Sequence, residues 1–391
     1  MTTHYDVIVA GLGAMGSATA AHLATRGKRV LGLERWTPGH RNASSHGDSR
    51  IIREMYFEHP MYVPLLQRAY ELWAELGDHA RTELLHITGG LMIGPEDGAL
   101  VTGTLRSARE YNLNYELLSP REVSFRYPAF MLRDDLIAVR DPRAGYLDPE
   151  ACNGAHLDLA AGKGAELRYD EPVIEWNSSE SGVTVTTPKA SYSADHLVLA
   201  VGARTRSLLK GLELPLEVER QAVFWMEPDP DAANYDESAF PIYAYEYEPR
   251  EICYGFPRLP RGVKSSVMHS GEIVKDADSV DSEIRDEEVN PLRRALAPIL
   301  PGMSRAPVRE RDVCLFTNTP DHDFIIDFHP AHSRVLISSA CSGHGFKFAS
   351  AIGEIQADLV TSGRSRFDLG PFGLDRPSLY LNSSEKILYR K

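Results

Sequence analysis

Residues 6–16 read DVIVAGLGAMG, an apolar run followed by three spaced glycines. The run at 6–10 is rich in β-branched side chains, which is typical of a strand buried on both faces of a parallel sheet. Residues 17–26 then have helical character, and Gly27 stands where a glycine commonly ends a helix. A second apolar run, VLGL at 30–33, predicts the next strand. Together these segments predict a β-α-β unit at the start of the chain.

The glycines between the predicted strand and helix have the spacing GxGxxG. Glycine at these positions permits a tight turn and lets the backbone approach a pyrophosphate at the helix N-terminus. Glu34 follows the second strand, 18 residues after Gly16, where a carboxylate can accept hydrogen bonds from ribose hydroxyls. The pattern predicts a dinucleotide site that includes Gly11, Gly13, Gly16 and Glu34. It does not distinguish FAD from NAD, because both contain the same ADP half.

The composition is that of a folded, acidic protein. Its 391 residues include 42 Lys and Arg against 55 Asp and Glu, a formal net charge of −13. A general polyanion binder needs clustered Lys and Arg, so we expect no nucleic-acid partner. The length exceeds the ~250–300 residues that one hydrophobic core usually serves, so we expect two domains.

The cysteines and histidines show no pattern of a disulfide framework or a metal site. Four cysteines, at 152, 253, 314 and 341, form no CxxC pair, which favours a reducing cytoplasm. Cys341 and His344 are spaced C-x-x-H, but no second pair completes a zinc site. No Lys or Arg precedes the apolar stretch at 7–24, and glycines interrupt it, so we expect neither a targeting segment nor a membrane span.

Later segments indicate the remaining elements. Helical spacing predicts helices at 61–77, 150–162 and 349–359. Apolar runs predict strands at 166–169, 182–187, 196–201 and 335–339. Ser119-Pro120 has the pattern of a helix N-cap followed by proline in the first turn. Aromatic and proline residues are frequent between 215 and 320, which is typical of a sheet that covers a pocket.

Four separated blocks carry a family resemblance. They read HGDSRIIR at 46–53, YGFP at 254–257, DFIID at 323–327 and SGHGFKF at 342–348. In this order they resemble the monomeric sarcosine oxidase and N-methyltryptophan oxidase family of flavoproteins, over a stretch that reaches about residue 375. The resemblance implies FAD as the cofactor.

The resemblance also implies an α/β (α+β) fold with two domains. A Rossmann-like FAD-binding domain of discontinuous segments would take residues 1–85, 150–214 and 320–391. A mixed-sheet substrate-binding domain would take residues 86–149 and 215–319. Besides the glycines at 11, 13 and 16 and Glu34, the expected cofactor contacts are Arg35, His46, Ser49, Arg50, Val173, Cys314, Gly343, Gly345 and Lys347.

Cys314 lies in the segment RDVCLFT at 311–317. Taken alone, a cysteine in an apolar run behaves as a small buried hydrophobe. The resemblance places here the cysteine that carries the flavin through an 8α thioether, which implies a covalent cofactor.

Arg50 and Arg53 are three residues apart, so on a helix they would share one face. One interpretation is a surface pair bonded to nearby carboxylates: Asp48, Glu54 or Glu58. The resemblance implies instead that Arg50 lies near the flavin ring and that Arg53 pairs with the substrate carboxylate, a task that suits the fork of a guanidinium. Lys347, after two glycines in the turn before the last helix, would be the second anchor of that carboxylate.

Lys264 matches the lysine that the family holds near the flavin to assist oxygen reduction. A cation there would stabilise superoxide as it forms, which is the electrostatic reason for a lysine. His269 is expected to be catalytic too, although it follows Lys264 by five residues, one more than in the family. His46 is expected to cap the chain locally or to bond the flavin.

Two residues near the expected pocket depart from the family pattern. Phe316 stands where sarcosine-oxidising members have a tyrosine, so one hydrogen bond to the substrate carboxylate would be missing. Glu54 follows Arg53 where a histidine is expected. Together with Tyr254, Phe316 is expected to contact the substrate and to influence its choice.

The resemblance implies oxidation of a secondary-amine amino acid, sarcosine or another N-methyl amino acid. A hydride would pass to FAD, O2 would be reduced to H2O2, and the imine would hydrolyse to formaldehyde and the demethylated amino acid. The expected partners are this small substrate and O2, and the protein is expected to be monomeric. Alternatives are a dehydrogenase with another electron acceptor, an oxidase of cyclic imino acids such as proline or pipecolate, and a noncatalytic flavin-binding protein.

Overall fold

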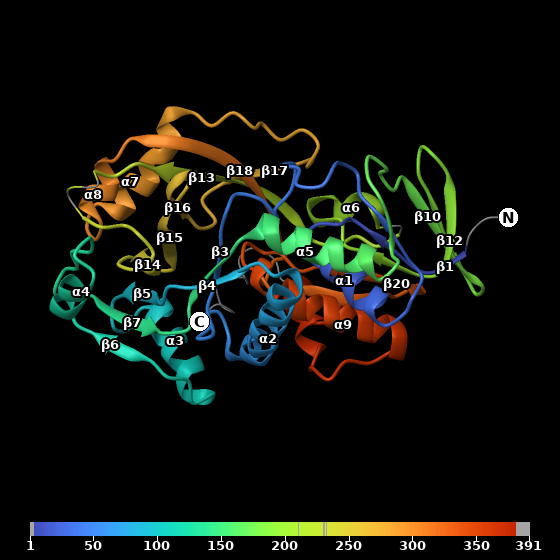
Figure 1. Cartoon of the computed structure of the whole chain (residues 1–391), viewed down its shortest axis with the longest axis horizontal. Coiled ribbons are helices and arrows are strands. Elements are labelled where there is room, and N and C mark those ends of the chain that lie inside the picture. The colour runs from blue at the N-terminus through green and yellow to red at the C-terminus, as the bar shows by residue number, and fades with distance from the viewer. Residues whose placement is uncertain (1–3, 210, 230, 232, 381–391) are drawn as a thin grey trace.

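The computed structural model describes residues 4–209, 211–229, 231 and 233–380. Figure 1 shows two regions side by side, one around β1 and β12 and the other around β5, β7 and β13–β16, with β3 and β4 between them. In these residues, no helix is both long and apolar enough to cross a membrane.

The first region is built on an eight-stranded sheet of the described chain. Its strands are β1 (His4–Ala10), β2 (Val30–Leu33), β9 (Glu166–Arg168), β10 (Glu175–Ser179), β11 (Gly182–Thr186), β12 (Ser191–Leu199), β19 (Ile325–His329) and β20 (His332–Ser339). The pairs β20–β12, β12–β1, β1–β2 and β2–β9 are parallel. The expected strands of 6–10 and 30–33 therefore lie at the centre of a parallel sheet, which confirms the predicted β-α-β unit.

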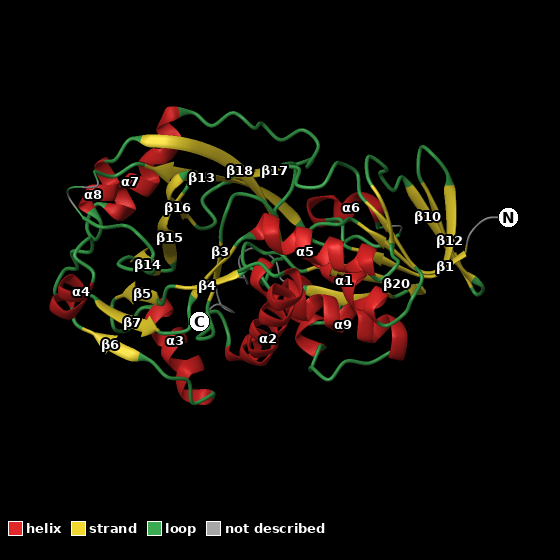
Figure 2. Ribbon diagram, viewed as in Figure 1, coloured by secondary structure: helices red, strands yellow, loops and turns green. Residues whose placement is uncertain are grey.

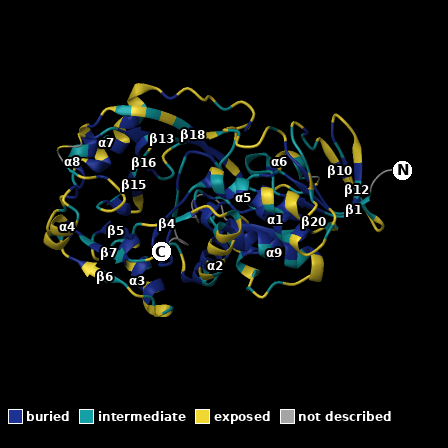
Figure 3. Ribbon diagram, viewed as in Figure 1, coloured by how far each residue is buried: buried dark blue, intermediate teal, exposed yellow. Residues whose placement is uncertain are grey.

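Helices cover this sheet and pack on one another. They are α1 (Ala14–Thr25), α2 (Val63–Ala80), α5 (Pro149–Gly162), α6 (Thr205–Leu208) and α9 (Ala349–Ser362). Helix α1 packs against both α5 and α9, which Figure 2 shows grouped beside β1 and β20. Gly353 permits the contact between α9 and α1, because a Cβ there would lie 2.6 Å from Ala18. Gly16 permits the contact between α1 and the preceding turn, because a Cβ there would lie 1.8 Å from the Gly11 carbonyl oxygen. Figure 3 shows the faces where these helices meet as buried.

The second region is built on a nine-stranded sheet of the described chain in the order β17-β13-β16-β15-β14-β5-β7-β6, with β18 beside β13. Its strands are β5 (Gly90–Gly94), β6 (Glu116–Leu118), β7 (Ile137–Asp141), β13 (Glu217–Met226), β14 (Ile242–Glu248), β15 (Glu251–Leu259), β16 (Gly262–Val267), β17 (Glu272–Val274) and β18 (Val308–Asn318). Helices α3 (Ala99–Glu110), α4 (Pro120–Arg126), α7 (Asn290–Leu296) and α8 (Pro301–Arg305) belong to this region. Short 3-10 turns are η1 (Pro60–Tyr62), η2 (Gly202–Arg204), η3 (Asp286–Val289), η4 (Phe346–Phe348), η5 (Gly370–Phe372) and η6 (Pro377–Tyr380).

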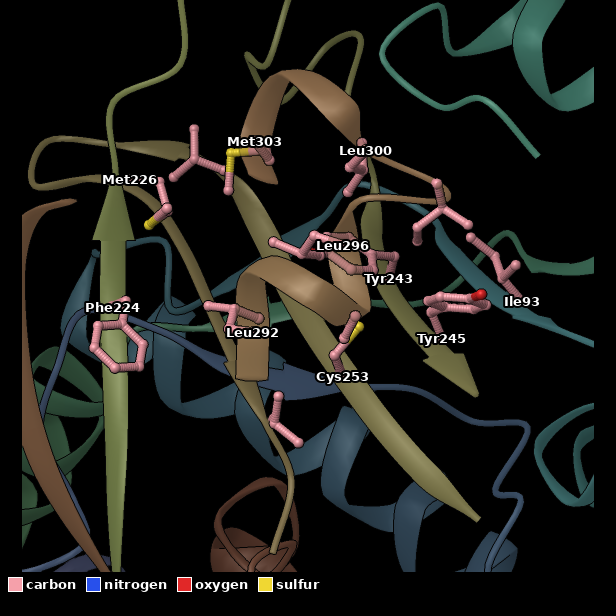
Figure 4. Packing of buried hydrophobic residues seen from close by; sticks show 14 of the residues in the cluster. Ile93, Phe224, Met226, Tyr243, Tyr245, Cys253, Leu292, Leu296, Leu300 and Met303 are labelled. Carbon is pink, nitrogen blue, oxygen red and sulfur yellow. The ribbon is translucent and has the colours of Figure 1, made fainter. Parts of the chain in front are cut away.

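One apolar core holds the second region together. Figure 4 shows Leu292 and Leu296 of α7, with Leu300 and Met303, against side chains of the sheet. The sheet side chains labelled there are Ile93, Phe224, Met226, Tyr243, Tyr245 and Cys253. Because α7 and α8 cover this face of the sheet, the opposite face of β14–β16 and β18 is available to line a cavity.

A third, three-stranded sheet joins the regions: β3 (Arg50–Ile52), β8 (Gly145–Leu147) and β4 (Leu85–Ile87). The expectation that Arg50 and Arg53 share a helix face is therefore wrong, because Arg50 lies in an extended strand that pairs with Leu147. The helix start at Ser119 is confirmed, with its side chain accepting from the Glu122 N–H in a capping box. The two-domain fold is confirmed in kind, and the exact domain boundaries stay a prediction.

Candidate functional site

A cavity that opens to solvent lies between the two large sheets, and the empty space within it and its open mouth together is about 1950 Å³. Most of the residues predicted from the sequence line it: Gly11, Gly13, Glu34, Arg35, His46, Ser49, Arg50, Arg53, Val173, Tyr254, Lys264, Cys314, Phe316, Gly343, Gly345 and Lys347. These residues come from segments spread over more than 330 positions of the chain, so only the tertiary fold brings them together.

Two predicted residues lie outside this lining in the described structure: Gly16 and His269. Gly16 has a packing role instead: because it has no side chain, α1 can lie directly against the Gly11 loop. His269 bonds the buried Glu219 carboxylate through Nδ1 at 3.0 Å and has a positive φ of 52°. The extra residue after Lys264 places Met268 on the cavity wall instead. The His269 ring still packs edge-on against Phe316 of the cavity wall, at 5.5 Å between ring centres, so its catalytic role stays a prediction.

The glycine-rich end of the cavity has the form expected for a dinucleotide. Gly11 has a φ of +85°, and a Cβ there would lie 2.5 Å from the Ala200 carbonyl oxygen. Glu34 accepts from the Leu12 N–H at 2.8 Å and faces His40 at 3.5 Å. Burial alone would raise the pKa of the Glu34 carboxyl, but hydrogen bonds from His40 and Leu12 hold it below its usual value. The carboxylate is therefore ionised and able to accept from ribose hydroxyls.

Arg50 and Cys314 meet in the middle of the cavity wall, one on β3 and the other on β18. Arg50 Nη2 lies 3.4 Å from Cys314 Sγ and donates to the Ser44 carbonyl at 2.7 Å. The Cys314 side chain is buried within the protein but faces the cavity. The guanidinium and the thiol therefore lie side by side on the cavity wall.

Lys264 lies fully buried on β16. Its Nζ donates to the carbonyls of Gly47 at 2.6 Å and Ser49 at 2.9 Å. Burial, and then the charge of Arg50, lowers the pKa of Lys264 well below its usual value. The lysine thus presents a fixed donor on the cavity wall rather than a solvated charge.

Arg53 and Lys347 converge at the aromatic ring of Tyr56 although 294 positions separate them. The Arg53 Cζ lies 4.5 Å and the Lys347 Nζ 5.3 Å from the centre of that ring. Arg53 Nη2 also donates to Glu58 at 2.6 Å, while Lys347 Nζ donates to the His344 carbonyl at 2.6 Å. Of the carboxylates weighed from the sequence, Glu58 is the partner of Arg53; the Arg53 side chain is buried and that of Glu58 is partly exposed.

The backbone next to Arg53 is fixed by Asp141, at the end of β7. This buried carboxylate accepts the N–H groups of Glu54 at 3.1 Å and Met55 at 3.3 Å. The Glu54 carboxylate pairs with Arg143 at 3.2 Å, and Glu54 does not belong to the cavity lining. The sequence showed neither contact, because Asp141 lies far from this segment along the chain.

The wall near Arg53 and Lys347 is otherwise mostly apolar. Its side chains are Ile51, Phe57, Ala244, Ile252, Tyr254, Phe256, Met268 and Phe316. Burial raises the pKa of Tyr254 to about 12, so its hydroxyl stays protonated. This part of the cavity suits a small organic molecule with one anionic end.

Comparison with known proteins identifies the family. The profile of the FAD dependent oxidoreductase family, abbreviated DAO, matches residues 6–359. The chain belongs to this family. It is 39% identical to monomeric sarcosine oxidase of Streptomyces avermitilis over 95% of this chain and 97% of that one. It is 33% identical to N-methyl-L-tryptophan oxidase of Escherichia coli over 95% of this chain and 99% of that one.

Solved structures agree with this assignment. NikD, described as an unusual amino acid oxidase essential for nikkomycin biosynthesis, superposes with a TM-score of 0.82 at 26% identity, covering 95% of this chain and 98% of its own. L-proline dehydrogenase from P. horikoshii has the same fold at a TM-score of 0.82 and 20% identity, covering 95% and 97%. The chain is thus an FAD-dependent oxidase of the sarcosine oxidase type that acts on CH–NH donors.

The cavity residues fit FAD. Five buried polar atoms of wall residues have no hydrogen-bond partner in the described protein: His46 Nδ1, Ser49 Oγ, Arg53 Nε, Glu58 Oε1 and Ser339 Oγ. Leaving such a group unsatisfied costs about 1–3 kcal/mol, so these atoms suit a polar ligand. With Glu34 and the Gly11 turn at one end, the wall can hold the adenosine, pyrophosphate and flavin in sequence.

The titration of Lys347 gives a testable pH dependence. Burial, and then the charge of Arg53, lowers the pKa of Lys347 to about 7. A bound carboxylate favours the protonated amine, so binding above pH 7 must take up a proton, and affinity falls as pH rises. We expect the Kd of propionate to increase by up to about tenfold per pH unit above about pH 7.

The measurement is a titration of the FAD-loaded protein with propionate between pH 6 and 9, followed by flavin absorbance. Lys347→Met is the control and should bind weakly with a flat profile, because Arg53 stays charged throughout this range. A wild-type Kd that does not change with pH would show that Lys347 does not bind the anion.

Proposed function

We propose that this enzyme oxidises a secondary-amine amino acid, sarcosine or another N-methyl amino acid, with O2 as electron acceptor. The observation that carries the proposal is the convergence of Arg53 and Lys347 on one buried, otherwise mostly apolar part of the cavity. Two cations beside a single carboxylate, Glu58, leave a positive site for one more anion. An amino acid supplies that anion, whereas an amine without a carboxylate does not.

The chain's own residues orient the substrate. Glu58 holds one amino group of the Arg53 guanidinium, and Arg53 Nε is buried without a partner in the described protein. A substrate carboxylate can therefore accept one hydrogen bond from Arg53 Nε and another from Lys347 Nζ. These two bonds fix its position and exclude water. The apolar wall then keeps the amine nitrogen in its neutral form, from which electrons are removed more readily.

The reaction balances without a protein base. Bound FAD supplies the acceptor for a hydride from the carbon next to nitrogen. The amine loses two electrons and two protons to become an imine, and water cleaves the imine to formaldehyde and the demethylated amino acid. O2 takes up two electrons and two protons to give H2O2. Lys264, fixed by two carbonyls beside the cavity, would stabilise the negative charge that develops on oxygen.

We also propose that the FAD is covalent, through an 8α thioether to Cys314. Support comes from the position of the thiol on the cavity wall, 3.4 Å from the Arg50 guanidinium. A cysteine sulfur that faces the cavity supplies the nucleophile that such a bond requires. Cys341 also lines the cavity, but burial raises the pKa of its thiol.

Finally, we propose a cytoplasmic monomer. Every cysteine of the chain is free in the structure, which suits a reducing compartment. The relatives named monomeric sarcosine oxidase support the expectation of a single-chain enzyme.

The covalent link predicts the fate of the flavin on denaturation. Acid-precipitated wild type should stay yellow, whereas Cys314→Ala should release its flavin into the supernatant. Cys341→Ala is the matched control, a second cavity-lining cysteine whose removal should leave the pellet yellow. Free flavin in the wild-type supernatant would contradict the assignment.

The substrate class is tested by peroxide release from a panel of sarcosine, longer N-methyl amino acids, proline, pipecolate and N-methyl amines without a carboxylate. We expect N-methyl amino acids to yield H2O2 and formaldehyde in equal amounts. Faster oxidation of the cyclic imino acids, with no formaldehyde, would replace the proposed substrate. Turnover with a dye but not with O2 would make the enzyme a dehydrogenase.

A further inference from the structure

The Gly47–Asp48 turn has a geometry that the reaction proposed above does not use. Both residues have positive φ, +95° for Gly47 and +66° for Asp48. The two successive N–H groups of this turn point to one side, where they form a small anion-binding nest. Positive φ is unusual for a residue other than glycine, so an interaction must hold the turn in this form.

The anion in this nest is the side chain of Glu150. One carboxylate oxygen accepts the Gly47 N–H at 2.5 Å, and the other accepts the Asp48 N–H at 3.2 Å. Glu150 lies in the first turn of α5, 103 positions away in the sequence, and is exposed. It is therefore a surface residue with a specific contact to the turn between His46 and Ser49, two residues of the cavity wall.

The other side of the same turn holds Lys264. The Gly47 carbonyl accepts from Lys264 Nζ at 2.6 Å, and a Cβ on Gly47 would lie 3.6 Å from this Nζ. The Asp48 carboxylate also accepts from the Trp225 indole N–H at 3.1 Å, and the Trp225 ring centre lies 5.3 Å from the Lys264 Nζ. The position of the turn thus fixes both the carbonyl and the ring that surround the amine.

We infer that Glu150 is a positioning residue for Lys264, acting through the Gly47–Asp48 turn. Without its carboxylate, the two N–H groups lose their acceptor, and the turn can relax from positive φ. The Gly47 carbonyl then moves away from Lys264 Nζ, and the amine leaves the place where O2 is reduced. This inference rests on the proposed role of Lys264 in oxygen reduction.

The test separates the two halves of the reaction. In FAD-loaded Glu150→Ala, we expect reoxidation of the reduced enzyme by O2 to slow by about tenfold or more, because small displacements of a catalytic group have large effects on rate. Anaerobic reduction by sarcosine should stay within about twofold, since Arg53 and Lys347 lie elsewhere in the cavity. The reoxidation rate of Glu150→Gln should lie between those of wild type and Glu150→Ala, because the amide keeps one acceptor oxygen.

A second readout does not depend on turnover. Hydrogen exchange of the peptide containing Gly47 and Asp48 should be faster in Glu150→Ala than in wild type, with or without FAD. Asp158→Asn is the control, an exposed acid on the same helix, and it should change neither exchange nor reoxidation. Glu150 is exposed, so its variants should unfold at temperatures close to that of wild type.

The outcomes are distinguishable. Unchanged reoxidation in Glu150→Ala, while Lys264→Met slows it, would overturn the inference and leave the proposed function intact. Unchanged reoxidation in Lys264→Met would overturn the proposed role of Lys264 and the inference with it. Equal losses in both half-reactions of Glu150→Ala, or unchanged exchange at Gly47 and Asp48, would also overturn the inference.

Discussion

The burial of three basic side chains in one cavity is the constraint on which the rest of the site depends. Arg53, Lys264 and Lys347 are each at most 5% exposed. An unpaired charge in such a place is costly, so each needs partners that the fold supplies. Carbonyls hold the two lysines, and the Glu58 carboxylate holds Arg53. Because Arg53 Nε has no hydrogen-bond acceptor in the described protein, the site is suited to an anion.

The two large sheets explain how these basic side chains meet. Strand β16 of the second sheet carries Lys264, and the turn after β20 of the first sheet carries Lys347. Arg53 follows β3, whose pairing with β8 joins the two regions. Asp141 ends a strand of the second sheet and binds the backbone beside Arg53. Substrate and oxygen sites are therefore set by the same contacts that join the regions.

Local sequence was sufficient where the structure is local. The glycine turn, the first β-α-β unit and the Ser119 cap could be predicted, because each depends on neighbouring residues. Spacing misled for Arg50 and Arg53, since pairing with a distant strand overrides helical periodicity. The departure at His269 was visible, but only the fold shows that the longer turn brings Met268 to the wall. Glu58 could be named from the sequence as one of three candidate partners, because it lies five residues from Arg53, whereas the contact of Glu150 with Gly47 spans 103 positions and depends on the tertiary fold.

The central claim is that Arg53 and Lys347 bind one carboxylate together. The most direct measurement is a double-mutant cycle of propionate binding at pH 6.5 with Arg53→Met, Lys347→Met and both. Each single change should weaken binding by about ten- to a hundredfold, equivalent to ~1.5–3 kcal/mol for a charge-assisted contact. The effect of the double variant should differ from the sum of the two, because the residues share a single anion. Normal binding by either single variant, or strictly additive losses, would contradict the account.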